Sequence, residues 1–183
     1  MVQCIGSRNK EHPYCSRICC SQAIKNALRI KRSRPETALY ILHRDVRVYD
    51  FYEDFYSEAL ERGVQFIRME GEPSVNDGEK LTVSLVDGIT GKKIELQADL
   101  MVLSAGVVPG QSNPEMAERL GVPLDDYGFF KGADSNLRPV EFEREGTFIC
   151  GLAHSPMPLD ECIAQASAAA GKACLVLLQS RSV

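Results

Sequence analysis

The first twenty residues of this 183-residue chain hold four of its seven cysteines. The stretch "CIGSRNKEHPYCSRICC" places Cys4, Cys15, Cys19 and Cys20 at the spacing C-x10-C-x3-C-C. Thiolates bind zinc and iron–sulfur clusters, and they are also the nucleophiles of dithiol chemistry. In a reducing compartment, clustered thiols are more often metal-binding or redox-active than paired in structural disulfides. The residue types therefore point to metal or redox chemistry.

The spacing bears on which metal these cysteines would hold. Tetrahedral zinc is typically bound by a tight C-x2-C loop, which this stretch lacks. If the chain is helical from about Cys15, then Cys15 and Cys19 lie one turn apart on one face, while Cys20 points about 100° away. A cubane iron–sulfur cluster is larger and takes its thiolates at separated corners. The spacing favours a cluster over zinc, and redox thiols or four unrelated structural thiols stay open as alternatives.

Other residues carry weaker signals. His12 lies inside the cysteine loop, where it could be a fifth ligand or a solvated loop residue. His43, beside Arg44 and Asp45, indicates an ion-paired strand end rather than a catalytic site. Free cysteine is among the most buried residue types. Three further cysteines are therefore expected to be small apolar residues of the interior: Cys150, Cys162 and Cys174.

Composition and missing motifs exclude several classes of function. A net charge of −4 and a pI near 5.5 argue against nucleic acid or anionic lipid as a partner. No apolar run approaches the ~18 residues of a membrane span, and the start has no basic leader followed by an apolar region. Gly6 stands alone where a dinucleotide site needs G-x-G-x-x-G. We therefore expect a cytoplasmic protein without a complete dinucleotide site. Apolar residues make up 44% of the chain, which is ample for a buried core.

The elements that must position the cysteines follow from hydrophobic periodicity. The pattern predicts helix 19–34, strand 38–44, helix 51–63 and strand 64–69. A helix between two strands indicates parallel pairing. Two further strands, 80–87 and 94–106, form an antiparallel excursion, and the second ends in an apolar run typical of a strand buried on both faces.

A break in the pattern after "LSAG" predicts a domain boundary at about residue 107. Beyond it, Asn113 is expected to cap a short helix that Pro114 begins and Gly121 ends. A strand over 146–151 and an alanine-rich helix over 158–178 follow. The fold class expected is α/β, a parallel sheet with helices on both faces and an antiparallel β excursion.

Several motifs, taken together, carry a family likeness. They are "QCIGSR", "PYCSRICC", "AIKNAL", "LHRDVRVYDFYEDFY", "ADLMVLSAGVVP", "GFF", "LRPVEF" and "GLAHSP…DECIAQASAAA". Over nearly its whole length the chain resembles the A subunit of heterodisulfide reductase. Members of that family are iron–sulfur flavoproteins of archaea and anaerobic bacteria, and some of them take part in methanogenesis. They have a thioredoxin-reductase-like core that binds FAD, and they pass or bifurcate electrons within multi-subunit complexes.

The resemblance implies a set of cofactor contacts. The four clustered cysteines would ligate a 4Fe-4S cluster close to the flavin. Residues 1–107 would correspond to most of a nucleotide-binding-like domain that is inserted into the FAD domain, and 108–183 to the closing part of the FAD domain. Flavin contacts would come from six residues: Lys25, Gly106, Gly151, Leu152, Ala153 and His154.

Two of these contacts are argued from details of the sequence. Related flavin reductases carry Gly-Asp at the end of the corresponding strand, but this chain has Gly151-Leu152, so His154 is the candidate for the polar contact. Lys25 follows Cys20 on the same predicted helix, where its charge could stabilise reduced, anionic flavin. A solvated lysine on a basic helix face is the competing interpretation.

The start of the chain is a further departure from the family. Met1 would lie inside the first strand of the inserted domain, without the glycine-rich half of the FAD domain. We therefore expect a fragment that does not hold FAD tightly. A first strand at an exposed sheet edge would also favour a homodimer.

Three functions compete at this point. The first is electron transfer between the cluster and FAD, as part of a complex with other subunits. The second is a zinc-stabilised module that docks partner subunits. The third is a dithiol oxidoreductase with one cysteine of low pKa.

Overall fold

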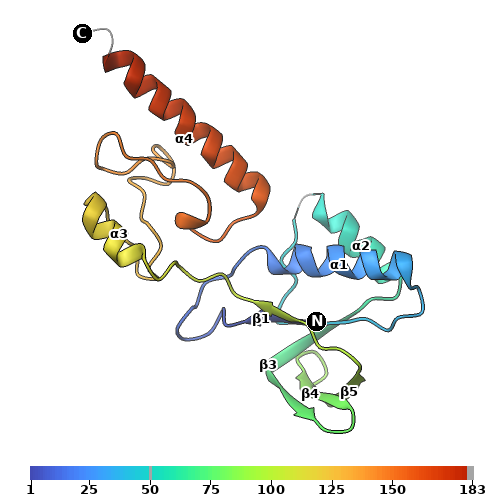
Figure 1. Cartoon of the computed structure of the whole chain (residues 1–183). Coiled ribbons are helices and arrows are strands. Elements are labelled where there is room, and N and C mark those ends of the chain that lie inside the picture. The colour runs from blue at the N-terminus through green and yellow to red at the C-terminus, as the bar shows by residue number, and fades with distance from the viewer. Residues whose placement is uncertain (50, 181–183) are drawn as a thin grey trace. The chain divides into compact units, whose positions relative to one another are not determined.

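The computed structural model describes residues 1–49 and 51–180. The chain divides into two compact units, Met1–Gly106 and Val107–Val183. Each unit is described by itself below, and the elements of both are labelled in Figure 1.

The first unit is built on a six-stranded mixed sheet with the strand order β5-β4-β3-β2-β1-β6. Its strands are β1 (Val2–Ile5), β2 (Tyr40–His43), β3 (Gln65–Asp77), β4 (Leu81–Asp87), β5 (Lys93–Ala98) and β6 (Leu103–Ala105). β6, β1, β2 and β3 pair in parallel, while β3, β4 and β5 form an antiparallel meander. The predicted α/β class with an antiparallel excursion is confirmed.

Helices α1 (Cys19–Ser33) and α2 (Tyr52–Glu61) connect the parallel strands and pack together on one side of them (Figure 1). The buried face of α1 repeats at helical spacing, which is why this stretch forms an amphipathic helix. The core on this side consists of Ala23, Ile24, Ala27, Leu28, Ile41, Ala59 and Val64. The alanines leave room for close approach of the two helices.

A second core lies among the strands themselves and consists of Val2, Leu42, Met69, Val83 and Leu85. It forms because β3 changes partner along its length, from parallel β2 to antiparallel β4. The register of β3 shifts between Glu70 and Ser74, and Gly71 adopts φ 75° within this irregular stretch. A bulge of this kind bends a strand and increases its twist.

The last predicted strand of this unit differs from the structure. Segment 94–106 contains two strands, β5 and β6, rather than one. β6 is an edge strand, and Leu103 in it is 53% exposed, so it is not buried on both faces as expected. β1 is paired on both sides, which removes the exposed first strand on which the homodimer was argued; the edge strands of the sheet are β5 and β6.

The second unit packs a small core of Ala117, Val122, Phe130, Phe142 and Ile149. Its helices are α3 (Asn113–Leu120), the single 3-10 turn η1 (Gly151–Ala153) and α4 (Leu159–Ser180). Gly121 ends α3 in the left-handed conformation with φ 64°, as its sequence position predicts. Asn113 is the first helical residue rather than the cap, because its side-chain amide donates to the Gly128 carbonyl at 2.8 Å.

Two other expectations for this unit are wrong. Segment 146–151 is no strand: Phe148 makes one isolated bridge with Glu141, in a tight reversal where Phe142 N–H donates to the Thr147 carbonyl at 3.2 Å. Too few residues remain beyond the turn at Gly146 to extend a ladder. The distant cysteines are not buried either: Cys150 and Cys174 are exposed and Cys162 is half-buried.

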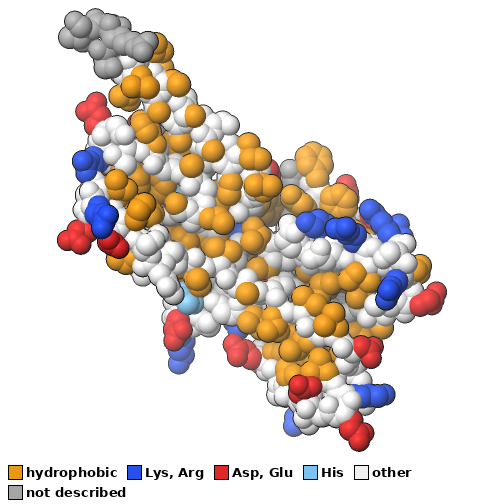
Figure 2. Space-filling view, in the orientation of Figure 1, with side chains coloured by type: hydrophobic (Ala, Val, Ile, Leu, Met, Phe, Trp, Pro, Cys, Tyr) orange, Lys and Arg blue, Asp and Glu red, His pale blue; other side chains and the backbone are white. Residues whose placement is uncertain are grey.

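Helix α4 carries an apolar surface that the short apolar runs of the sequence did not predict. Its exposed apolar side chains include Leu159, Ile163, Leu175, Leu177 and Leu178, and Figure 2 shows apolar side chains along this helix. By length and composition alone, α4 meets the criteria for a membrane-spanning helix, with a mean hydropathy of 1.3 over Leu159–Gln179. One helix of suitable length and composition does not by itself assign the chain to a membrane.

Candidate cysteine-lined cofactor site

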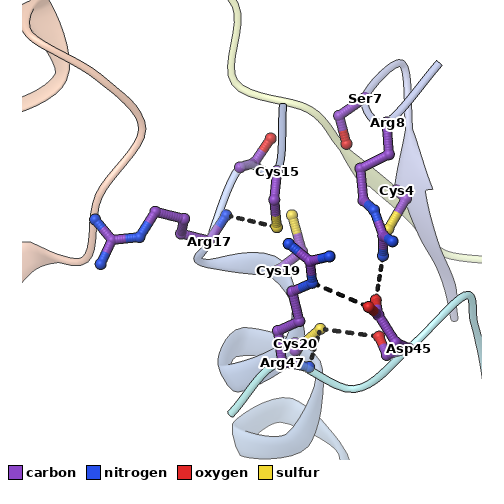
Figure 3. Close-up of a pocket in the computed structure, with 10 residues that line it drawn as sticks. Cys4, Ser7, Arg8, Cys15, Arg17, Cys19, Cys20, Asp45 and Arg47 are labelled. Atoms are coloured by element: carbon purple, nitrogen blue, oxygen red, sulfur yellow. Dashed lines mark hydrogen bonds and ion pairs between the residues drawn. The ribbon is translucent and has the colours of Figure 1, made fainter. Parts of the chain in front are cut away.

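Four thiols from separate parts of the first unit line one pocket (Figure 3). Cys4 belongs to β1, Cys15 to the loop that follows it, and Cys19 and Cys20 to the first turn of α1. The other lining residues are Ser7, Arg8, Ser16, Arg17, Asp45 and Arg47. The pocket lies beyond the carboxyl ends of the parallel strands β1 and β2, where sites of α/β sheets commonly form.

The loop between β1 and α1 is held in an unusual backbone conformation. Cys4, Arg8 and Arg17 have positive φ values of 63°, 57° and 64°, and all three line the pocket. For residues other than glycine, this backbone conformation costs about 1–3 kcal/mol, and such residues cluster at functional sites. Backbone bonds from Arg8 N–H to Tyr14 C=O at 3.1 Å and from Ser7 N–H to Cys4 C=O at 3.3 Å fix the loop.

This loop also corrects the geometry assumed for the cysteines. α1 begins at Cys19, so Cys15 is not one helical turn before Cys19 on the same helix face. Cys15 reaches the pocket from the loop instead, and its Sγ accepts a hydrogen bond from Arg17 N–H at 3.3 Å. The position of Cys15 is therefore set by the loop, while Cys19 and Cys20 still diverge as consecutive residues of α1.

Two sulfurs receive backbone donors. Besides the bond at Cys15, the N–H of Arg47 donates to Cys20 Sγ at 3.5 Å. The Cys20 thiol in turn donates to the Asp45 carbonyl at 3.9 Å. Backbone donors stabilise negative charge on sulfur, and hydrogen bonds to sulfur are among the factors that set the potential of an iron–sulfur site.

The protein environment disfavours thiolates unless a cation is present. Burial raises the pKa of the Cys19 thiol to about 11, and the neighbouring cysteines add to the effect. Burial likewise raises the pKa of Cys4 and Cys20, although Arg8 opposes the shift at Cys4. A bound metal reverses this preference because it deprotonates its thiol ligands outright. Cys4, Cys19 and Cys20 are therefore poorly suited to act as free nucleophilic thiols, and a bound metal would ionise them.

Four thiols are the donors that this pocket offers to a metal centre. Among the described residues, no three His, Cys, Asp or Glu side chains already form a site for a metal ion. A multi-iron cluster binds its thiolates at separated corners, so this donor set fits a cluster.

The structure places the other predicted residues of the first unit outside the pocket lining. His12 lies in the loop with its N–H bonded to Asn9 Oδ1 at 2.7 Å. Lys25 is exposed on α1. Gly106 has a structural reason to be glycine: its N–H donates to the Ile5 carbonyl at 2.7 Å, and a Cβ there would lie 2.9 Å from Ser7 Cβ. Cofactor roles for Lys25 and Gly106 stay predictions.

The remaining predicted flavin contacts share one turn of the second unit. Gly151, Leu152 and Ala153 form η1, and His154 N–H closes it on the Gly151 carbonyl at 2.9 Å. Gln165 of α4 fixes this turn, because its Oε1 accepts from Gly151 N–H at 3.0 Å and its Nε2 lies 3.4 Å from His154 Nδ1. Their contact with a flavin stays a prediction.

Sequence reasoning missed the charged residues of the pocket. Asp45 was interpreted only as part of an ion-paired strand end, and Arg8 and Arg47 were not considered. A usable signal was present: Asp45 and Arg47 directly follow β2, at the same sheet end as Cys4 in β1. Ser7 and Ser16, which are 2% and 1% exposed, carry no such signal.

Comparison with known proteins identifies relatives along the whole chain. No family model matches it. It is 40% identical over its full length to the A subunit of ferredoxin:CoB-CoM heterodisulfide reductase from Methanosarcina acetivorans, covering 23% of that protein. It is also 40% identical, over 98% of its length, to the iron-sulfur A subunit of CoB–CoM heterodisulfide reductase from Methanocaldococcus jannaschii, covering 28%. The chain thus spans about a quarter of the length of these relatives.

A solved structure agrees with the fold. Thioredoxin reductase of T. acidophilum matches with a TM-score of 0.52 and 19% identity, over 80% of this chain and 45% of that one. The match confirms the predicted likeness to the thioredoxin-reductase fold, and the sequence relatives confirm the predicted family. Over the quarter of these relatives that it spans, the chain is therefore similar to the A subunits of heterodisulfide reductases.

Proposed function

We propose that this chain is the cluster-binding, electron-transferring part of an oxidoreductase like the A subunit of heterodisulfide reductase. Cys4, Cys15, Cys19 and Cys20 would ligate a 4Fe-4S cluster. The observation that carries the proposal is the convergence of these four thiols, from a strand, a loop and a helix, on one pocket. Three residues of the lining are also held in the left-handed conformation, which is typical of functional sites.

The residues of the pocket would control the environment of the cluster. A bound cluster supplies storage of single electrons. Cys4 is buried and the other three thiols are half-buried, which limits the access of water to the sulfurs. The N–H groups of Arg17 and Arg47 donate to two of the sulfurs, and the guanidinium groups of Arg8 and Arg47 add positive charge. These features favour the more negative, reduced state.

FAD would be the partner cofactor, held in the full-length protein rather than tightly by this chain. The turn Gly151–Ala153 with His154 supplies the proposed flavin contacts, together with Lys25 and Gly106. The relatives' names mention ferredoxin, H(2)/formate and the CoB-CoM heterodisulfide. We infer a cytoplasmic multi-subunit complex in which this chain passes electrons between such partners. A homodimer of the isolated chain, through the edge strands β5 or β6, would double the mass measured by light scattering.

Metal analysis after anaerobic purification tests the cluster. We expect about four irons and four sulfides per chain, the content of one cubane, with broad visible absorption and an EPR signal on reduction. Cys19→Ser or Cys20→Ser should each remove most of the iron. Cys150→Ser, an exposed cysteine of the other unit, is the matched control and should leave the iron content unchanged.

The alternatives predict different results in the same experiment. One zinc per chain without visible absorption would replace the cluster by the docking-module function. A chain free of metal, with one rapidly alkylated thiol and a reversible disulfide, would support the dithiol oxidoreductase. The raised pKa values of Cys4, Cys19 and Cys20 argue against that third function, because the thiolate is the reactive form.

A further inference from the structure

We propose that Asp45 is a positioning residue that holds Arg8 and Arg47 against the thiols, so that two guanidinium groups fix the positive charge at the cysteine-lined pocket. The inference deepens the proposed function and rests on it where the cluster is concerned. Its first part, the placement of charge on the thiols, concerns only side chains of this chain.

The Asp45 carboxylate lies between the two arginines (Figure 3). Its Oδ1 forms an ion pair with Arg8 Nη1, and its Oδ2 accepts from Arg47 Nε at 3.0 Å. Arg8 and Arg47 both line the pocket together with the four thiols. One carboxylate therefore holds two arginines of the pocket that contains the proposed ligands.

The backbone of the same segment reaches a third thiol. The Asp45 carbonyl accepts from Cys20 Sγ, and Arg47 N–H donates to that sulfur. Arg44 fixes this end of β2 from the other side, because its guanidinium bonds the Arg8 carbonyl and lies 3.9 Å from Glu72 Oε1. The segment that follows β2 is thus tied to the cysteine loop by side chain and backbone alike.

Charge explains why a carboxylate is needed here. Two unpaired guanidinium groups beside one pocket would repel each other and turn toward water. A shared carboxylate removes this repulsion, and the three groups together retain one positive charge. The side chain of Arg8 is only 21% exposed, against 42% for Asp45 and 50% for Arg47, so Arg8 depends most on its partner. Partly buried pairs are screened by salt less than exposed ones.

A double-mutant cycle on the metal-free chain tests the positioning role. The variants are Arg8→Gln, Asp45→Asn and the double substitution, and the readout is the iodoacetamide alkylation rate of Cys4, followed by mass spectrometry of its peptide. Arg8→Gln should slow alkylation roughly threefold to tenfold, because a nearby cation favours the thiolate. In the Asp45→Asn background, the same substitution should change the logarithm of the alkylation rate by less than about half of its change in the wild-type background. Arg29→Gln, an exposed arginine on α1, is the matched control and should leave the rate unchanged.

The same cycle on the iron-loaded chain uses the midpoint potential from EPR-monitored reduction. Arg8→Gln should lower the ratio of reduced to oxidised cluster at a fixed potential by up to about tenfold. For one electron, this corresponds to a decrease of the midpoint potential by up to about 59 mV. The effect should again shrink when Asp45 is Asn. Equal effects of Arg8→Gln in both backgrounds, in either readout, would overturn the positioning role. If circular dichroism shows that an Arg8 variant is unfolded, Arg47→Gln with the midpoint potential as the readout gives the equivalent cycle.

The two proposals fail in different ways. A chain that binds no iron but shows coupling on alkylation contradicts the cluster and supports Asp45 as the residue that places charge on the thiols. A chain with full iron and additive substitutions keeps the cluster and contradicts the role of Asp45.

Discussion

Gly106 allows the chain after β6 to pass close to Ser7, a residue of the pocket lining. It directly follows β6, and its N–H donates to the Ile5 carbonyl. Gly106→Ala should destabilise the chain by about 1–3 kcal/mol, because its Cβ would lie 2.9 Å from Ser7 Cβ and 3.1 Å from the Gly6 carbonyl oxygen. Denaturant unfolding measures the change. In Gly78→Ala the new Cβ would meet only Asn76 Oδ1 at 3.9 Å, so this control should stay within about 0.5 kcal/mol of wild type.

His43 gives the chain a stability that depends on pH. Burial lowers the pKa of His43 below its usual 6.5, with Arg68 acting in the same direction and Asp45 against it. Above pH 6.5 the imidazole is neutral in both states and stability is full. As the pH falls through 6.5, the unfolded chain takes up the proton first, and stability decreases. The free energy of unfolding should therefore fall between pH 7 and 5.5, and His43→Gln should flatten this dependence. An unchanged slope in the variant would contradict the assignment.

At the scale of elements, the buried face of α1 holds Cys19 and Cys20 in place. Leu28 is 3% exposed in the core beneath this helix. Leu28→Ala should cost about 2–5 kcal/mol, the range for truncating a buried leucine. The exposed Leu60 of α2 is the matched control, and Leu60→Ala should cost far less, since that side chain is 47% exposed. Thermal unfolding followed by circular dichroism compares the two variants.

The elements also show what a sequence can and cannot predict. α1, β2, α2 and the start of β3 follow from hydrophobic spacing, because each buries one continuous face. The cysteine loop could not be derived, since left-handed φ values at Cys4, Arg8 and Arg17 have no signature outside glycine. The four cysteines themselves were evident from their types. Their geometry was not, because it depends on the loop and on Asp45 and Arg47, which lie some 25 residues further along the chain.

At the scale of the whole molecule, the pocket belongs to one unit alone. All ten lining residues fall within Met1–Gly106, which has its own sheet and two cores. Residues 1–106 produced alone should therefore fold and keep the iron content of the full chain. Circular dichroism and iron analysis check this, with the Cys19→Ser version of 1–106 as the iron-free control. A disordered or iron-free 1–106 would show that the second unit is required.

The pairing of β1 between β2 and β6 sets an order of events during synthesis. Cys4 is synthesised well before β6, and its strand gains its last neighbour only when Leu103–Ala105 has been made. At roughly 5–20 residues per second, the interval is on the order of 5–20 seconds. Throughout that time the four thiols are present on a nascent chain that cannot yet enclose them. We therefore expect iron delivery to follow release of β6, and an assembly factor that acts earlier would need to shield the thiols until then.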